Sequence, residues 1–233
     1  MKTEKPKVAV ELNGKPLICH VIENIQSAGI HDIVVIVGYK KEEVIEICKP
    51  FSGIRFCEQK EQLGTAHALM SAEDLLGEFT GTVIVAAGDV PLISPDTFRQ
   101  MADYHSQNQM ECTVLSADME NPFGYGRIIR NDKGYVESIV EEKDASENEK
   151  LVTEINTGTY CFNAPYVFES LKKIGNDNAQ KEYYLPDLVK IYKKNNRPVG
   201  AIKLQDPLES HGINSQEDLK MVSSLIKERG LST

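Results

Sequence analysis

The sequence of 233 residues predicts an α/β fold with a mixed, mostly parallel sheet and flanking helices. Two observations predict it. Up to residue 105, segments with helical spacing of apolar residues alternate with short β-branched runs, as in a doubly wound sheet with right-handed crossovers. A glycine follows two of these runs, Gly38 after 32–37 and Gly88 after 82–87, which indicates a strand ending in a loop.

The elements of the first half follow from local signals. The segment 16–28 has helical spacing and ends at Gly29, a typical helix C-terminal residue. The run DIVVIV at 32–37 is uniformly apolar after its first residue, which favours a strand buried on both faces. Ser94 and Pro95 are typical of a helix N-cap and first turn. Further helices are expected at 42–48 and 65–76, and further strands at 54–57 and 82–87.

The second half is more mixed, and we expect its antiparallel strands to cover the site. Expected strands are 111–117, 126–130, 135–140 and 155–162. Expected helices are 165–173, 184–195 and 216–229. No segment has the composition of a linker, so we expect one domain across residues 1–233.

Composition excludes several classes of protein. Hydrophobic residues make up 41% and charged residues 26%, as in ordinary globular proteins. No apolar run approaches the length of a membrane span, and a net charge of −9 disfavours binding to nucleic acid or an anionic membrane. The cysteines are odd in number and scattered, so we expect a reducing cytoplasm rather than a disulfide framework or zinc site: Cys19, Cys48, Cys57, Cys112 and Cys161. There is no P-loop and no G-x-S-x-G motif.

Parallel sheets bind ligands at the carboxyl ends of their strands, so the loops after Val37, Cys57 and Ala87 are the expected location of the chemistry. Asp89 directly follows the strand at 82–87 and could hold Mg²⁺ together with phosphate oxygens. The alternative is a turn in which the Asp89 carboxylate accepts hydrogen bonds from backbone amides.

Two other groups of residues have both a functional and a structural interpretation. Gln59 could read a base edge beside Gly64, or the segment could be an ordinary connection with Thr65 as the helix N-cap. Glu141 and Asn156 could bind the hydroxyls and N-acyl group of a sugar, or be a solvated strand end and a bulge.

Taken in order, a set of segments resembles one family, the uridyltransferase domain of the bacterial bifunctional N-acetylglucosamine-1-phosphate uridyltransferase / glucosamine-1-phosphate acetyltransferase. The segments span nearly the whole chain: PKVAVELNGKP (6–16), EQKEQLGTAHA (58–68), GDVPLIS (88–94), NPFGYGRIIR (121–130), VEEKDAS (140–146), EINTGTY (154–160), NAQKEYYLPD (178–187) and HGINS (211–215). The resemblance implies a Rossmann-like, GT-A-like sugar nucleotidyltransferase fold.

The resemblance also implies the reaction and its cofactor: transfer of UMP from UTP to N-acetylglucosamine-1-phosphate with Mg²⁺, giving UDP-N-acetylglucosamine and pyrophosphate. By position, Lys7 and Asp89 match catalytic residues, and Asp89 and Asn214 match Mg²⁺ ligands. The nucleotide site implied by the match comprises Lys7, Gln59, Gly64, Thr65, Ala87, Gly88 and Asp89. The implied sugar site comprises Gly126, Glu141, Asn156 and Asn214. The family implies peptidoglycan synthesis as the biological context.

The sequence departs from the family at three places. Some members have tyrosine or cysteine at the position of Ala87. Met1 corresponds to the methionine that ends the family's glycine-rich phosphate loop, so we expect the first strand and that loop to be missing. Residues 215–230 resemble the helix that leads toward the β-helix acetyltransferase domain, without which we expect no trimer. The alternatives are a transferase for another sugar 1-phosphate and an inactive fragment that binds UDP-sugar.

Overall fold

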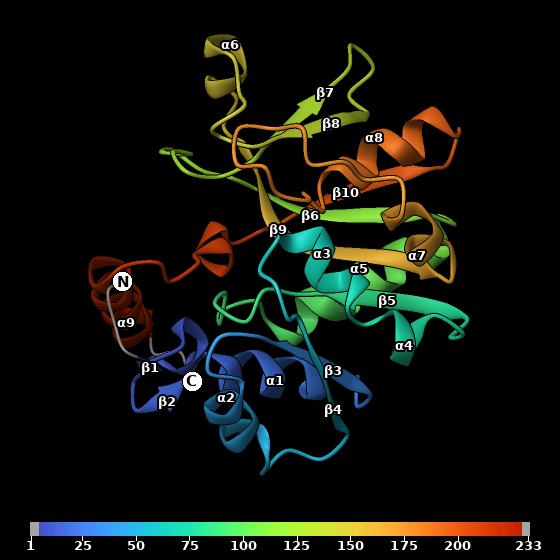
Figure 1. The fold of residues 1–233 in the computed structure, drawn as a ribbon. Coiled ribbons are helices and arrows are strands. Elements are labelled where there is room, and N and C mark those ends of the chain that lie inside the picture. The colour runs from blue at the N-terminus through green and yellow to red at the C-terminus, as the bar shows by residue number, and fades with distance from the viewer. Residues whose placement is uncertain (1–4, 230–233) are drawn as a thin grey trace. The chain divides into compact units, whose positions relative to one another are not determined.

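The computed structural model describes residues 5–229, and their contacts divide the chain into two compact units (Figure 1). Unit 1 holds the described residues up to Glu58, Ala87–Arg99 and those from Leu208 onward. Unit 2 holds Gln59–Ala86 and Gln100–Pro207. Helix α5 (Pro95–Gln107) and the short 3₁₀ helix η2 (Pro207–Ser210) contain residues of both units. Met1, where the family's phosphate loop was expected to end, lies outside the described residues.

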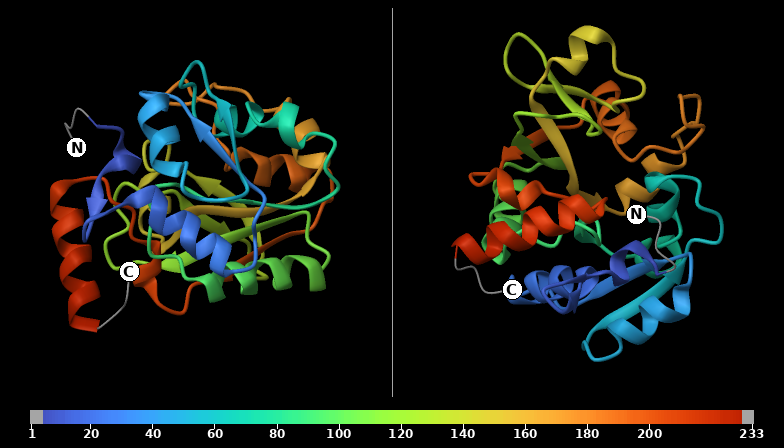
Figure 2. Two further views of the ribbon diagram at one scale, coloured as in Figure 1. Left: turned by 90° about the horizontal axis from the view of Figure 1, so that it is seen from below. Right: turned by 90° about the vertical axis from the view of Figure 1, so that its left-hand side faces the viewer.

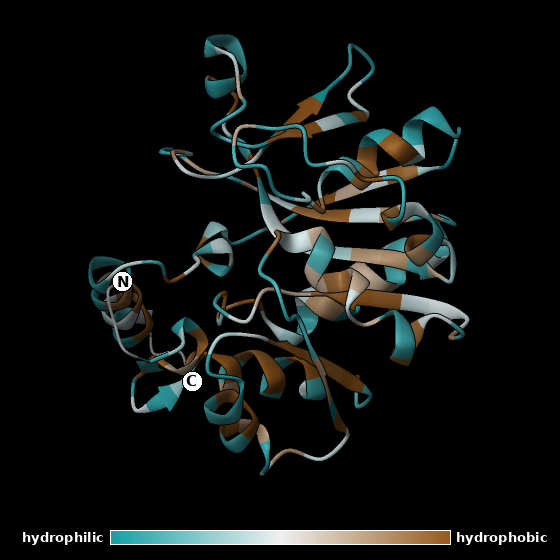
Figure 3. Cartoon of the chain, viewed as in Figure 1, coloured by the Kyte–Doolittle hydropathy of each residue, from teal (hydrophilic) through white to brown (hydrophobic). Residues whose placement is uncertain are grey.

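Unit 1 is built around a parallel pair of strands. Its elements are η1 (Lys7–Ala9), β1 (Glu11–Leu12), β2 (Lys15–Pro16), α1 (Leu17–Ser27), β3 (Ile33–Val37), α2 (Lys41–Cys48), β4 (Ile54–Glu58) and α9 (Gln216–Arg229). Strands β3 and β4 pair in parallel through the crossover helix α2. The apolar side chains of α1 and β3, including Ile18, Ile22 and Val35, form a buried cluster. Figure 3 shows the hydrophobic residues along these elements in brown. The predicted strand is present, but only Val35 and Val37 on one of its faces are buried, while Val34 and Ile36 on the other face are half-buried.

Helix α9 packs into a second core of unit 1 (Figure 2). Its Val222 and Ile226 are buried against Leu12, Leu17 and Ile213. The predicted bounds of this helix agree with the observed ones, Gln216–Arg229. Its apolar face contributes to the unit, whatever follows it in the chain.

Unit 2 is a mixed sheet with helices. Its elements are α3 (Thr65–Met70), α4 (Glu73–Leu76), β5 (Gly81–Val85), β6 (Cys112–Asp118), β7 (Arg127–Arg130), β8 (Val136–Val140), α6 (Glu147–Lys150), β9 (Glu154–Ala164), α7 (Tyr166–Leu171), α8 (Asp187–Lys194) and β10 (Val199–Lys203). The strand order is β10-β6-β9-β7-β8, and β5 also pairs with β9. Strand β10 is parallel to β6, and the other pairs are antiparallel.

The core of unit 2 lies along the long strand β9. Tyr160 and Phe162 stack with ring centroids 5.4 Å apart, and Phe162 stacks on Tyr192 of α8 at 6.2 Å. All three rings are almost fully buried. Burial of aromatic side chains of this size is a large favourable term, so β9 is a rigid support for residues at its two ends.

The predicted α/β fold with a mixed sheet and flanking helices is confirmed, although β1, β2 and α6 were not expected and other elements differ locally. The expected helix 65–76 is two helices, because Ser71 Oγ donates to His67 O at 3.1 Å and the chain turns there. Strand β10 was not predicted, since Gly200 weakens its pattern; a Cβ there would lie 2.9 Å from the Tyr104 ring. Strand β5 was expected in a parallel sheet with β3 and β4, but it pairs antiparallel with β9, which offers it a full five-residue register.

Across residues 5–229, no helix has both the length and the apolar character needed to cross a lipid bilayer.

Candidate functional site

Three predicted site residues meet in unit 1, although they come from distant parts of the chain. Lys7 begins the short helix η1, Asp89 lies in the loop after residue 87, and Asn214 precedes α9. The ammonium group of Lys7 donates to Asp89 Oδ2 and to Asn214 Oδ1. Asp89 lies in a turn, as the structural alternative expected, but the partner of its carboxylate is the ammonium group of Lys7 rather than a backbone amide.

Neighbouring backbone contacts hold this cluster in place. Ile213 N donates to Asp89 O at 2.9 Å, which joins the two loops directly beside the site. The backbone amide of Asn214 donates to Asp218 Oδ2 at 2.8 Å at the start of α9. A side chain at Gly88 would place Cβ 3.0 Å from Val8 Cγ1, so glycine permits the close approach of this loop. Ala87 accepts from Val90 N at 3.3 Å through its backbone oxygen.

The chemistry of the cluster fits a hard cation. A carboxylate oxygen and an amide oxygen converge on one positively charged nitrogen, and both are oxygen ligands of the kind that Mg²⁺ takes. Within the described residues, no group of three or more His, Cys, Asp or Glu side chains could hold a metal ion. A metal bound by Asp89 and Asn214 would therefore complete its coordination with water and phosphate oxygens.

The predicted base-binding residues lie together in unit 2. Gln59 Nε2 lies 3.1 Å from both Gly64 O and His67 Nδ1, so its amide oxygen is the acceptor left for a ligand. Gly64 has φ +111°, and a Cβ there would lie 2.6 Å from Tyr183 O. Thr65 is the first residue of α3 rather than its N-cap, which is Gly64, and its hydroxyl accepts from Leu185 N at 3.0 Å.

Three of the predicted sugar-binding residues lie in or directly beside three neighbouring strands of unit 2. Gly126 precedes β7, Glu141 follows β8 and Asn156 is in β9, and these strands are adjacent in the order β9-β7-β8. Asn156 N donates to Gly126 O at 2.8 Å. A Cβ on Gly126 would lie 3.0 Å from Glu141 Oε1, so glycine leaves the space beside this carboxylate open. Gly126 therefore lies next to both Glu141 and Asn156, whereas Asn214, the fourth residue of the predicted sugar site, belongs to unit 1.

Glu141 is not the solvated strand end of the structural alternative. Desolvation by burial raises the pKa of its carboxyl group, and the carboxylates of Asp144 and Asp187 raise it further. The charge of Arg127 acts in the opposite direction. A half-buried carboxylate with a perturbed pKa is typical of a binding or catalytic site.

Sequence reasoning missed two residues that contact the predicted site. His67 was not among the predicted site residues, yet its ring contacts Gln59. Arg127 was given no role, although its side chain is 2% exposed and pairs with Glu142 at 2.6 Å. The signal available in the sequence was an arginine directly after a glycine turn, followed by two glutamates at the end of the next strand.

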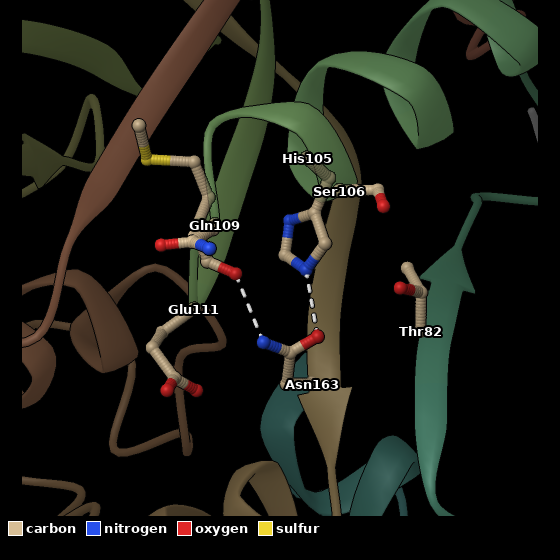
Figure 4. A pocket seen from close by; sticks show the side chains of 7 residues that line it. Thr82, His105, Ser106, Gln109, Glu111 and Asn163 are labelled. Atoms are coloured by element: carbon tan, nitrogen blue, oxygen red, sulfur yellow. Dashed lines mark hydrogen bonds between the residues drawn. The ribbon is translucent and has the colours of Figure 1, made fainter.

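A separate polar pocket of about 320 Å³ lies in unit 2, and no predicted site residue lines it (Figure 4). In it, Asn163 Oδ1 faces His105 Nε2 at 3.0 Å, and Asn163 Nδ2 donates to Met110 O at 2.9 Å. His105 Nδ1 lies 2.9 Å from Thr113 Oγ1. The carbonyl of Met110 fixes the Asn163 amide, so the ring of His105 donates through Nε2.

This network predicts a pH-dependent contribution to stability. Burial lowers the pKa of His105 below its ordinary value of 6.5, against the opposing effects of Asn163 and Glu111. The unfolded state then binds a proton before the folded state as the pH falls through 6.5. We expect the stability advantage of the protein over the His105→Gln variant to shrink between pH 7.5 and 5, by up to about 1.4 kcal/mol per pH unit. Urea unfolding at several pH values measures this difference, and a constant difference would contradict the assignment.

The α/β fold brings a lysine, an aspartate and an asparagine side chain together in unit 1, an arrangement compatible with an enzyme that acts on phosphate groups. Comparison with known families agrees. The Nucleotidyl transferase family matches residues 1–207, and the chain belongs to it.

Curated bacterial relatives carry the name of a bifunctional protein. The chain is 44% identical over 229 residues to "Bifunctional protein GlmU" of Oceanobacillus iheyensis, covering 98% of this chain and 50% of the relative. It is 43% identical to the protein of the same name from Listeria monocytogenes strain HCC23, with the same coverage. The chain thus spans about half the length of the curated relatives it matches.

Solved structures support the fold. A UDP-glucose pyrophosphorylase crystallised with UDP-glucose superposes with a TM-score of 0.73, covering 96% of this chain and 91% of that one. Its sequence identity is 18%, so the likeness concerns the fold alone.

Proposed function

We propose that this chain transfers UMP from UTP to N-acetylglucosamine-1-phosphate, releasing pyrophosphate, in the cytoplasm of a bacterium. The observation that carries the proposal is the convergence of Lys7, Asp89 and Asn214 on one point from three distant segments. Support for a sugar substrate comes from Gly126, which lies next to both Glu141 and Asn156 in unit 2.

Each group has a defined task in this reaction. A phosphate oxygen of the sugar substrate attacks the α-phosphorus of UTP, and pyrophosphate leaves from the opposite side. Lys7 binds a phosphate oxygen through its ammonium group, and Asp89 and Asn214 hold Mg²⁺. The bound Mg²⁺ supplies positive charge that neutralises the phosphates. An acidic protein with a net charge of −9 can thus bind two anionic substrates through a local positive centre.

The remaining residues select the substrates. The free amide oxygen of Gln59 accepts from the N3–H group of uracil; in cytosine N3 is an acceptor, and the N–H donors are on N4, at a different position of the base edge. Glu141 accepts from a sugar hydroxyl group, and Asn156 and the backbone at Gly126 bind the N-acetyl group. Catalysis in this scheme is positioning and charge stabilisation, without a covalent protein intermediate.

The test is pyrophosphate release by the chain with UTP, Mg²⁺ and N-acetylglucosamine-1-phosphate. We expect turnover with this pair and little with CTP or with glucose-1-phosphate. Turnover with a different pair only would overturn the substrate assignment. Binding of UDP-N-acetylglucosamine in calorimetry without any turnover would instead define a sugar-nucleotide-binding module.

A further inference from the structure

The glycine turn at the predicted sugar site is held by one ion pair, in which the arginine is buried. Arg127 Nη2 donates to Glu142 Oε2 at 2.6 Å, and another guanidinium nitrogen of Arg127 donates to Tyr125 O. The same Glu142 oxygen accepts from Gly124 N at 3.3 Å. Both sides of the turn Gly124–Gly126 are therefore held by two charged side chains.

The position of this pair makes it relevant to the substrate. Arg127 directly follows Gly126 and lies opposite Ile155 in β9, next to Asn156. Glu142 directly follows Glu141 at the end of β8. Each member of the pair is thus the chain neighbour of a predicted sugar-binding residue, and the pair crosses between the two strands that present them.

If the pair served only to stabilise the turn, its burial would be energetically unfavourable. The Arg127 side chain is 2% exposed, and its Nε has no hydrogen-bond partner in the described part of the chain. Burial of an arginine with an unpaired donor is unfavourable, and apolar residues often stabilise such a place better. The hydrogen bond from Arg127 lowers the pKa of Glu142, which keeps its carboxyl group ionised as the acceptor for Gly124.

We propose that Arg127 and Glu142 are positioning residues for the sugar 1-phosphate, which they serve by fixing the glycine turn relative to Glu141 and Asn156. This inference rests on the proposed function, because it assigns the turn to the sugar substrate. The guanidinium fork matters here, since it reaches Glu142 and the Tyr125 carbonyl together, and a lysine cannot reproduce both contacts.

The chain offers a matched control in the same strand. Arg130 pairs with Glu154 through Nε at 2.7 Å and Nη2 at 2.6 Å, so it also forms a close, forked ion pair. It has no recorded hydrogen bond to the glycine turn. Arg130→Lys therefore reproduces the loss of a forked pair from β7, and with it the loss of stability, without loosening the turn.

The experiment compares Arg127→Lys with Arg130→Lys by two measurements. In hydrogen exchange, we expect the segment 122–127 to exchange about tenfold faster in Arg127→Lys and to be unchanged in Arg130→Lys. In kinetics, we expect the KM for the sugar 1-phosphate to rise about tenfold in Arg127→Lys, with the KM for UTP within about twofold. Glu142→Leu should behave as Arg127→Lys does, whereas Glu142→Gln keeps an acceptor oxygen and should restore most of the affinity.

The outcomes separate this inference from the proposed function. Equal exchange in the two lysine variants overturns the positioning role, whether or not the chain is active. Equal sugar KM values in an active enzyme overturn it too and leave the proposed function standing. A wild-type chain that uses no sugar 1-phosphate overturns both the proposed function and the assignment of the turn to a sugar.

Discussion

Asp89→Ala is expected to lower kcat for pyrophosphate release by at least about a thousandfold, equivalent to about 4 kcal/mol of transition-state stabilisation. The carboxylate is the only charged oxygen among the described contacts of the Lys7 ammonium group. Without it, Asn214 alone remains to hold a divalent cation, and Lys7 loses the partner that fixes its direction. The measurement is kcat over a range of Mg²⁺ concentrations, and high Mg²⁺ should not restore it.

The fold should survive this substitution. The Lys7 and Asp89 side chains are 37% and 24% exposed, so their ion pair is partly screened and contributes no more than about 1 kcal/mol. We therefore expect the melting temperature to change by only a few degrees. The control is Asp32→Asn, which removes the partner of Arg55 on the surface of unit 1 and should leave kcat unchanged. Full activity in Asp89→Ala would remove Asp89 from the proposed metal site.

The sequence predicted the elements whose signals are local. A continuous β-branched run at 32–37 and a helix beginning at Pro95 both depend on nearest neighbours, and both were confirmed. Strand β10 could not be predicted in this way, because Gly200 weakens its local pattern. The strand depends on hydrogen bonds to β6, which lies more than 80 residues earlier in the chain. The pairing of β5 could not be predicted for the same reason, since its antiparallel pairing with β9 depends on contacts across the whole of unit 2.

The predicted site divides in a similar way. Motif order indicated Lys7, Asp89 and Asn214, and the structure brings them together; their roles stay predictions. The role of Arg127 could not be predicted, because an arginine next to a glycine pair is most often solvated. Only its burial against Glu142 distinguishes it from a surface arginine. His67 is similar, since a histidine in a helix carries no sign that its ring faces Gln59.

Glu141→Gln is expected to lower kcat/KM for the sugar 1-phosphate by about a hundredfold and, at the same time, to stabilise the protein. The first effect follows from the loss of a charged acceptor for a sugar hydroxyl, which makes a stronger hydrogen bond than a neutral one. The second follows from burial: desolvation, aided by Asp144 and Asp187, raises the pKa of this carboxyl group, so its ionised form is disfavoured in the folded state. Glutamine removes that penalty and keeps the shape of the side chain.

The pH dependence gives this prediction its sign. The unfolded state ionises at the ordinary value of 4.5, whereas the folded state holds its proton to higher pH, so wild-type stability falls as pH rises between the two pKa values. The glutamine variant does not titrate, and its advantage should therefore be absent below pH 4.5, grow above it and then level off. Urea unfolding from pH 4 to 8 measures this advantage, with Glu147→Gln, a highly exposed residue of α6, as the control that should show no such growth. If the variant is inactive but no more stable than the wild type at pH 7, the predicted cost of burying the Glu141 carboxylate is wrong, while its role in substrate binding stands. If the variant is stabilised and its kcat/KM is normal, Glu141 does not belong to the sugar site.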